Sequence, residues 1–440
     1  MQKMENQTRS LSNSQKAAFK ALCGSLGNIF LTGGPGTGKS YLISEYLKTC
    51  GEKIPVVAST GAAAIIIGGR TFHSFFGLGI MQGGAEAVIE KAMSNSRLRK
   101  RLRDTITLVI DEISLISREA LECAERLARG VRNNGAPWGG IRIIAVGDFA
   151  QLPPISKGPQ RDWCFLSTAW KKTGFKRLVL KEVMRTHDRE FLEVLEEIRW
   201  GGISERVEAF LNGRLADDSE IEADVPHLFP RRAETEAYNL ARLSELSHPV
   251  KRFETYYEGR DHFVERLRRD APIPAVLELK KEAIVMLRVN DPKQRYVNGS
   301  VGRIVEFCGE VLLVEINGRE IEIPRFTFII QDDEGEEAAF AMNFPVNLAY
   351  ASTIHKVQGA TLDRVHISLK GLWEPGQAYV ALSRARSGSG ITLMGWDAYS
   401  IKADPQVKSF YENEEEPCED SNRAVQLNLT DPENVLGTLQ

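Results

Sequence analysis

The chain has 440 residues, and its 56 Lys and Arg against 59 Asp and Glu give a formal net charge of −3. This balance excludes a globally basic protein, so a nucleic-acid partner would have to meet local basic surfaces. The hydrophobic share of 42% and the charged share of 26% are ordinary for a globular protein, and the length predicts two to four domains.

Signals for targeting and for metal or disulfide chemistry are few. No apolar run reaches the length of a membrane span, and residues 1–10 are polar, without the apolar core of a secretory signal. The six cysteines form no C-x-x-C pair, which argues against a zinc ribbon or a disulfide framework. We therefore expect a cytoplasmic protein in a reducing compartment, with no membrane partner.

Apolar strand candidates alternate with longer segments of crossover type in the first half of the chain. The candidates are Ile29–Thr32, Val56–Ser59, Ile106–Ile110 and Ile141–Val146. Short apolar strands separated in this way are typical of a parallel sheet with helices on both faces. The sequence thus predicts an α/β fold for this half.

The first of these strands leads into a phosphate-binding loop, since Gly33–Ser40 has the full G-x-x-x-x-G-K-[ST] pattern. Its glycines let several backbone N–H groups point at one phosphate chain, and the helix that follows favours an anion at its N-terminus. Lys39 adds a charge toward the β- and γ-phosphates, and Ser40 offers a hydroxyl to Mg²⁺. The expected contacts are Gly34, Gly36, Thr37, Gly38, Lys39 and Ser40.

Two other interpretations of the glycines are weaker. No G-x-G-x-x-G can be laid over them, which excludes a dinucleotide-binding turn. An ordinary glycine-rich turn is the structural alternative, but the strand before and the helix after favour nucleoside triphosphate binding.

Polar residues follow the next two long strand candidates. Asp111 and Glu112 end the third, where the first acid is expected to hold Mg²⁺ and the second to polarise water for attack on the γ-phosphate. A strand that merely meets solvent is the alternative, which the phosphate-binding loop upstream makes less plausible. Gln151 follows the fourth strand and is placed to hydrogen-bond the γ-phosphate or the attacking water; a polar loop stopped by Pro153 and Pro154 is its alternative.

A second α/β pattern follows later in the chain. Its strand candidates are Ala283–Leu287, Leu348–Ala351, Val365–Leu369 and Ile391–Met394, with a helix expected over Pro375–Ala385. Residues 238–275 are helical in pattern and highly charged. Residues 301–345 instead show short alternating strands separated by turns at Gly309 and Asn317-Gly318, which favours a small β-barrel or meander. The tail after Phe410 is acidic, and we expect it to be disordered.

Two arginines are candidates for stabilising charge on a transferred phosphoryl group. Arg185 lies in Leu180–Thr186 and Arg384 lies in Ala378–Arg386. Such a guanidinium is worth about 10³–10⁵ in rate. Most single arginines are solvated or form surface ion pairs, so position alone does not assign this role.

Three short segments have the hydroxyls, backbone N–H groups and aromatic rings that hold phosphates or stack on bases. The candidates in them are Thr60, Gly61, Thr71, His73, Ser74, Phe75, Thr353, His355 and Lys356. Each has a structural alternative, because a His among apolar residues and the pair Phe75-Phe76 are more often core. The run 97–103 is the strongest local basic patch, and a solvated helix face explains it equally well.

Together these segments resemble a superfamily-one, group B DNA helicase of the Pif (petite integration frequency) family. The resemblance covers about residues 11 to 397. In chain order it rests on Leu11–Gln15, the phosphate-binding loop, Ala58–Ala64, Thr71–Phe75, Val109–Ser114, Gly147–Pro154, Arg185–Gly201, Tyr296–Gly299, Ile354–Leu362 and Tyr379–Arg386. Pro35 and Ala150 depart from the Ala and Phe expected in the family, and the glycine loop is closer to RecD.

The resemblance implies two RecA-like domains with ATP and Mg²⁺ between them. It adds Gln15 as the adenine-reading residue, Arg185 and Arg384 as arginines from the second domain, and Asn298 as a DNA contact. The domains expected are 1–64 with 105–178 for the first; 179–237, 276–300 and 346–410 for the second; 65–104 as a duplex-splitting insertion; 238–275 as a helical insertion; 301–345 as a Src-homology-three-like barrel; and 411–440 as the tail.

The resemblance also implies an activity, namely 5′→3′ translocation on single-stranded DNA with unwinding of duplexes at single-strand/duplex junctions. It extends the substrates to G-quadruplex DNA and RNA–DNA hybrids, and implies a nucleoid-associated monomer. The main alternative is a RecD-like single-strand translocase without unwinding of its own. A clamp-loader-type ring protein is less favoured because both arginines lie in one chain, and a passive nucleic-acid binder is less favoured because Lys39 and Glu112 are present.

Overall fold

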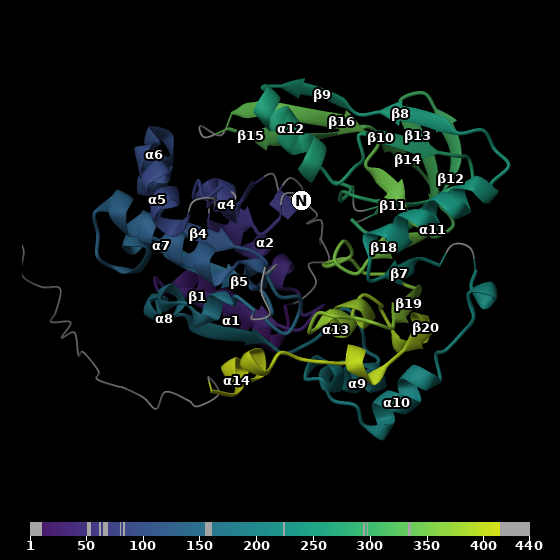
Figure 1. Cartoon of the computed structure of the whole chain (residues 1–440), viewed down its shortest axis with the longest axis horizontal. Helices are drawn as coiled ribbons and strands as arrows, with labels where there is room; N and C mark the ends of the chain where they lie inside the picture. The colour runs from purple at the N-terminus through teal and green to yellow at the C-terminus, as the bar shows by residue number, and fades with distance from the viewer. Residues whose placement is uncertain are drawn as a thin grey trace, which may run out of the picture.

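The computed structural model describes residues 11–413 apart from 51–53, 61–62, 65–68, 80, 82–83, 155–160, 223–224, 294, 297 and 333–335. Two lobes stand side by side, each with its own parallel sheet, and antiparallel sheets extend the second lobe (Figure 1). We call residues 11–180 the first lobe and residues 181–404 the second lobe. The α/β prediction with two parallel sheets is confirmed.

The first lobe is built on a six-stranded parallel sheet in the order β3-β2-β4-β5-β1-β6. Its strands are β1 (Ile29–Gly33), β2 (Val56–Ala58), β3 (Arg70–Thr71), β4 (Thr107–Ile110), β5 (Arg142–Val146) and β6 (Lys176–Leu180). The four predicted strands are confirmed within two residues, whereas β3 and β6 were not predicted. These two are the edge strands, and their partly exposed residues lack the apolar run by which the central strands are identified.

Helices cover both faces of this sheet. They are α1 (Asn13–Gly24), α2 (Lys39–Cys50), α4 (Phe72–Phe75), α5 (Gly84–Ser94), α6 (Ser96–Asp104), α7 (Arg118–Arg132) and α8 (Thr168–Thr173). Side chains of successive strand residues point to opposite faces, so Leu31 packs with Leu22 and Leu42 of α1 and α2, while Phe30 belongs to the core that includes Leu121 of α7. The sheet is thus buried on both sides, as its continuous apolar strands require.

The second lobe contains a four-stranded parallel sheet in the order β18-β7-β19-β20. Its strands are β7 (His227–Phe229), β18 (Ala351–Thr353), β19 (Val365–Leu369) and β20 (Ile391–Trp396), and its helices are α9 (Arg189–Arg199), α10 (Glu205–Asn212), α11 (Arg232–Glu245) and α13 (Gln377–Leu382). The predicted strand 348–351 is divided between the end of β17 and the start of β18. The strand predicted at 283–287 exists but lies outside this sheet, in an antiparallel one.

Three antiparallel sheets extend the second lobe, in the orders β14-β13-β12-β11-β17, β15-β16-β9 and β10-β8. Their elements are β8 (Lys251–Glu254), β9 (Tyr256–Gly259), α12 (Asp261–Asp270), β10 (Val276–Leu279), β11 (Ile284–Leu287), β12 (Val301–Cys308), β13 (Val311–Ile316), β14 (Arg319–Pro324), β15 (Phe326–Gln331), β16 (Glu337–Asn343) and β17 (Val346–Leu348). The strands and the turn at Asn317-Gly318 are confirmed, and both turn residues have positive φ, of 52° and 72°. The Src-homology-three-like barrel stays a prediction.

The wholly helical character predicted for 238–275 is wrong, because β8 and β9 separate α11 from α12. Both are mostly exposed strands whose charged residues hide the alternation that identifies a strand. The predicted tail also begins later than expected, since α14 (Pro405–Asn413) includes residues 411–413. Among the described residues, none of the helices combines the length and apolar character that crossing a membrane requires.

Candidate functional site

The phosphate-binding loop lies between β1 and α2, at the carboxyl edge of the first sheet. Gly36 and Gly38 have φ of 78° and 84°, a backbone conformation that residues with a Cβ atom rarely adopt. The Lys39 ammonium donates to the carbonyl oxygens of Gly33 and Gly34 at 2.7 and 3.2 Å, so the loop itself orients this cation. Burial lowers the pKa of Lys39. The loop therefore has the backbone shape and the desolvated cation that an anionic ligand requires.

Gln15 is held against this loop by the start of α1. Ser12 and Gln15 form a reciprocal capping box at the helix N-terminus. The Gln15 side-chain amide also donates to the carbonyl oxygen of Thr37 at 2.9 Å, and a Cβ atom on Gly38 would lie 2.5 Å from that amide nitrogen. Gly38 thus lets the glutamine approach the loop closely, which places Gln15 beside the expected nucleotide.

The acid pair Asp111-Glu112 follows β4 and faces the same loop. Glu112 adopts φ 50° and ψ 49°, an unfavourable backbone conformation for a glutamate and one typical of functional sites. Burial raises the pKa of Glu112 to about 7, with Asp111 adding to the rise and Lys39 opposing it. A carboxylate of this kind is suited to accept a proton near neutral pH.

Gln358 connects this acid pair to the second lobe. Its side-chain amide donates to Glu112 Oε2 and to Gln151 Oε1, both at 3.3 Å. The sequence indicated the segment Ile354–Leu362 but did not single out Gln358. Only the tertiary structure reveals that this glutamine bridges two residues of the other lobe.

The two predicted arginines complete the arrangement. Arg384 is 1% exposed and donates to the Val380 carbonyl oxygen at 2.9 Å. Burial and the neighbouring Arg185 lower the pKa of Arg384 to about 9, and burial lowers the pKa of Arg185 to about 10. Neither has an ion pair with a carboxylate in the described part of the chain. Two desolvated cations therefore lie together, where a bound anion would offset the free-energy cost of burying them.

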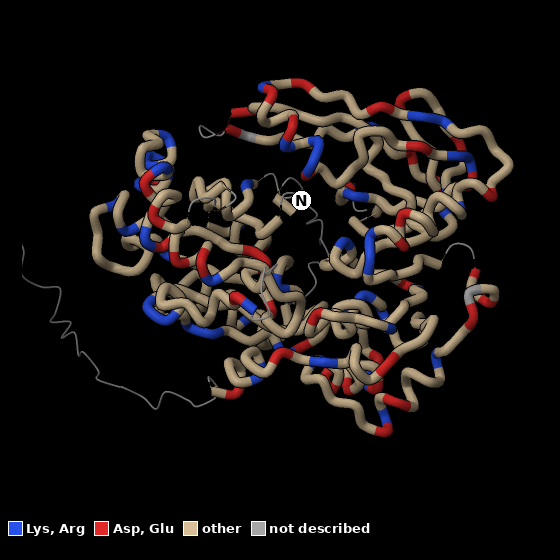
Figure 2. Tube along the Cα trace, viewed as in Figure 1, with Lys and Arg blue, Asp and Glu red and all other residues tan. Residues whose placement is uncertain are grey.

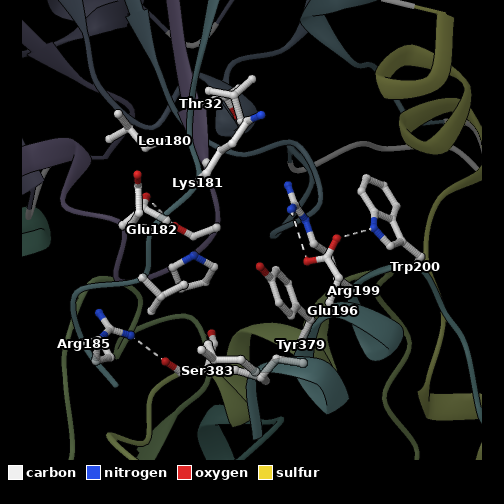
Figure 3. A pocket seen from close by; sticks show the side chains of 18 of the residues that line it. Thr32, Leu180, Lys181, Glu182, Arg185, Glu196, Arg199, Trp200, Tyr379 and Ser383 are labelled. Carbon is white, nitrogen blue, oxygen red and sulfur yellow. Dashed lines mark hydrogen bonds and ion pairs between the residues drawn. The ribbon is translucent and has the colours of Figure 1, made fainter. Parts of the chain in front are cut away.

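A cavity of about 590 Å³ unites these groups. It is lined from the first lobe by Gln15, the glycine loop, Lys39, Ser40, Glu112 and Gln151, and from the second by Arg185, Gly359, Thr361, Arg384 and Arg386. Glu112, Gln151, Arg185 and Arg384, predicted from distant parts of the sequence, are therefore brought to one seam, and Asp111 lies next to it, within electrostatic reach of Lys39. A second cavity of about 880 Å³ shares Pro35 and Arg185 with it and extends to Arg199, Trp200 and Tyr379 (Figure 3).

The nucleic-acid candidates fall into two groups, one in each lobe. Thr60 follows β2, and Thr353, His355 and Lys356 lie at the end of β18 or just after it, so both groups lie beyond the carboxyl ends of parallel strands, where such sheets bind ligands. Thr60, His355 and Lys356 are exposed, whereas Thr353 is buried and accepts from the Lys356 N–H at 3.3 Å. Gly61 lies outside the described residues. The Asn298 N–H donates to Asn290 Oδ1 at 2.8 Å.

The α4 candidates differ in how accessible they are. Phe75 is 2% exposed and its ring packs against Phe76 and beneath the Arg101 guanidinium, so the structure places it in the core, without a face open to a base. His73 is partly buried beside the Phe72 ring, and burial lowers its pKa. The Thr71 and Ser74 hydroxyls remain polar contacts at the surface of this helix.

Arg266, which the sequence did not indicate, reaches these hydroxyls from α12 of the second lobe. It donates to Ser74 Oγ at 3.1 Å and to Thr71 Oγ1 at 3.5 Å. A single arginine in a highly charged segment has no sequence signal that distinguishes it. The contact shows that the α4 candidates face the second lobe rather than open solvent.

The basic run 97–103 forms α6, at the outer edge of the first lobe (Figure 2). Leu98 and Leu102 are buried, and the Arg101 guanidinium donates to the Phe75 carbonyl oxygen at 2.6 Å. Part of this run therefore stabilises the core beneath it rather than standing free as a basic surface.

Comparison with known proteins gives concordant results. The family model described as PIF1-like helicase matches residues 10–218. The chain is 48% identical to the ATP-dependent DNA helicase Pif1 of Bdellovibrio bacteriovorus over 87% of this chain and 88% of that protein. It is 33% identical to the ATP-dependent DNA helicase PIF1 of Emericella nidulans, of which it spans 62%.

Solved structures of Pif1 from Bacteroides sp resemble this one throughout. The complex with ADP-AlF4 matches with a TM-score of 0.80 at 27% identity, covering 92% of this chain and 96% of that one. The form bound to ssDNA covers the same shares with a TM-score of 0.63. The likeness therefore extends across both lobes.

Arg384→Ala is expected to lower nucleoside triphosphate turnover about 10³- to 10⁵-fold with little change in nucleotide affinity, because its charge acts mainly on the transition state. Single-turnover hydrolysis and equilibrium nucleotide binding measure the two effects. Arg206→Ala, which alters an exposed arginine of α10, is the matched control. Lost affinity with preserved turnover would contradict the assignment, and Arg384→Lys separates charge from the planar fork if the alanine variant folds poorly.

Gln358→Leu is expected to lower the hydrolysis rate roughly tenfold, because Glu112 and Gln151 lose a shared hydrogen-bond donor from the second lobe. Steady-state hydrolysis at saturating nucleotide measures this change. Gln406→Leu, at an exposed position of α14, is the control. An unchanged rate in the Gln358 variant would show that the bridge is dispensable.

Proposed function

The chain belongs to the PIF1-like helicase family, and we propose that it is an ATP-dependent DNA helicase that moves 5′→3′ along single-stranded DNA and separates duplexes. The observation that carries the proposal is the cavity at the seam, which needs residues of both lobes to be complete. A ligand bound there is able to draw the lobes together, and its loss releases them.

The chemistry of the seam is that of phosphoryl transfer to water. The glycine loop and Lys39 hold the phosphates, and Gln15 lies beside the base. Glu112 accepts the proton of the attacking water, with Gln151 beside it. Arg185 and Arg384 stabilise the negative charge that spreads over the γ-phosphoryl oxygens.

Ser40 and Asp111 would hold Mg²⁺. Burial raises the pKa of Asp111, and the Glu112 N–H and Lys39 lower it only in part. A divalent cation there would offset the desolvation of the carboxylate. When bound, the ion neutralises phosphate charge.

DNA is proposed to cross both lobes, between the Thr60 and α4 candidates on one side and Asn298, Thr353, His355 and Lys356 on the other. The Bacteroides relative was crystallised bound to ssDNA, which supports single-stranded DNA as the ligand. Hydroxyls, amides and one lysine are suited to backbone phosphates rather than base edges, so we expect little sequence preference and a strong salt dependence. Alternate gripping by the two lobes would convert each closure into a step along the strand.

Further substrates and the state of the protein belong to the same proposal. Residues 65–104 would split the duplex at a single-strand/duplex junction, and G-quadruplex DNA and RNA–DNA hybrids would be unwound in the same way. The protein would act as a monomer with chromosomal DNA in the cytoplasm, because both arginines at the seam come from the same chain as the phosphate-binding loop.

Glu112→Gln is expected to lower kcat about 10²- to 10⁴-fold while ATP and single-stranded DNA still bind, because only the proton acceptor is lost. Phosphate release and fluorescence anisotropy of a labelled oligonucleotide measure the two properties. The exposed Glu193→Gln serves as the control. Near-normal turnover would remove Glu112 from this role.

A duplex with a 5′ single-stranded tail is expected to be unwound in the presence of ATP, and the same duplex with a 3′ tail is not. ATP hydrolysis should rise when single-stranded DNA is added and fall as salt increases. Strand displacement with fluorescent duplexes measures the polarity. Translocation without displacement would favour the RecD-like alternative, and ATP hydrolysis indifferent to DNA would refute the proposal.

A further inference from the structure

The last helix of the described chain returns from the second lobe and docks on the first. α14 follows β20 of the second lobe, yet lies against the first (Figure 1). Phe410 inserts among aromatic rings of the first lobe, with ring centroids 4.5 Å from Phe165 and 5.2 Å from Phe149. This apolar contact fixes α14 in place, and it delivers the next residue, Tyr411, to the cavity of about 880 Å³ that adjoins the nucleotide site.

The phenol of Tyr411 uses its full hydrogen-bonding capacity there. Its hydroxyl donates to Asp148 Oδ1 at 3.2 Å and accepts from the Phe149 N–H at 3.1 Å. The Thr32 hydroxyl lies 3.0 Å away, within hydrogen-bonding distance of the remaining lone pair. Burial raises the pKa of Tyr411, so the phenol stays protonated and able to donate.

These partners belong to the two segments that carry the chemistry. Thr32 precedes Gly33, whose carbonyl oxygen accepts from Lys39. Asp148 and Phe149 belong to the turn that ends at Gln151, whose N–H donates to the Asp148 carbonyl oxygen at 3.1 Å. One hydroxyl thus joins the strand leading to the phosphate-binding loop and the turn leading to Gln151.

Asp148 is the centre of this arrangement, with no exposed surface. Its Oδ1 atom accepts from Tyr411, from the Ala150 N–H at 3.1 Å and from Arg199 of α9 at 2.9 Å. Arg199 thereby reaches it from the second lobe, beside Tyr379 and Trp200 (Figure 3). Burial lowers the pKa of Lys39, and Asp148 is the carboxylate that opposes this most strongly.

We propose that Tyr411 is a positioning residue for ATP hydrolysis, whose phenol sets the Asp148–Gln151 turn against the phosphate-binding loop. The inference rests on the proposed function, because it concerns the same seam. Aromatic packing alone does not account for the contact: Phe410 supplies the apolar anchor, whereas the Tyr411 hydroxyl reaches a backbone N–H, a threonine and a buried carboxylate that would otherwise lose a partner.

Tyr411→Phe tests the proposal, since it removes the hydroxyl and keeps the ring. The DNA-stimulated kcat is expected to fall about 10- to 100-fold, as a small misplacement of reacting groups does, while the KM for ATP changes less than about twofold. Tyr399→Phe is the matched control, because the Tyr399 side chain is exposed. Phe410→Leu is the stability control, since it weakens the docking of α14 but keeps the phenol.

Thermal unfolding of all variants separates positioning from stability. At a temperature where every variant is folded, the proposal expects kcat to fall in Tyr411→Phe relative to Tyr399→Phe, and to fall further than in Phe410→Leu even if Phe410→Leu has the lower Tm. A kcat that follows Tm across Tyr411→Phe and Phe410→Leu, or an unchanged kcat in Tyr411→Phe, would overturn it. The wild-type protein reports on the proposed function separately, because absent DNA-stimulated hydrolysis there would contradict that function and not the role of Tyr411.

Discussion

The structure depends on desolvated charge at the seam between the lobes. Lys39, Arg185 and Arg384 lose solvent there, as do Asp111 and Glu112, and the shifted pKa values of all five have burial as their main cause. Such burial is costly unless opposite charges meet. Within the described residues Lys39 comes from one lobe and the two arginines from the other, so a polyanion between them offsets the cost of burying all three cations only when both lobes contact it. Binding and closure are therefore one event in energetic terms.

On the proposed DNA path, the loop after β18 would link this event to nucleic acid. Thr353, His355 and Lys356 precede Gln358 by a few residues, and Gln358 donates to Glu112 and Gln151 across the seam. Backbone hydrogen bonds from Lys356 to the Thr353 carbonyl oxygen and from Gln358 to the His355 carbonyl oxygen connect these residues to the glutamine. A shift of the exposed His355 and Lys356 on DNA binding would therefore reach Gln358 through one short segment.

The parts of the site that the sequence predicted are those encoded locally. The phosphate-binding loop and the acids after β4 are short patterns whose chemistry depends on their own strand and helix. Gln358, Arg266 and Tyr411 were missed because each acquires its role from a partner more than a hundred residues away. The same limit explains why the strand at β11 was assigned to the parallel sheet. It is buried along its whole length, which is typical of a parallel strand, but both strands that pair with it are antiparallel to it. Phe75 shows the converse, since its aromatic ring suggested stacking on bases while its neighbours place it in the core.

The path of the chain constrains how the seam opens. The lobes are joined covalently between β6 and α9, and α14 joins them again by docking the end of the second lobe on the first. Arg199 and Tyr411, one near each connection, meet at the same oxygen of Asp148. Two connections that converge on one buried carboxylate oppose separation of the lobes at that point, because separation would expose Asp148 and break both contacts.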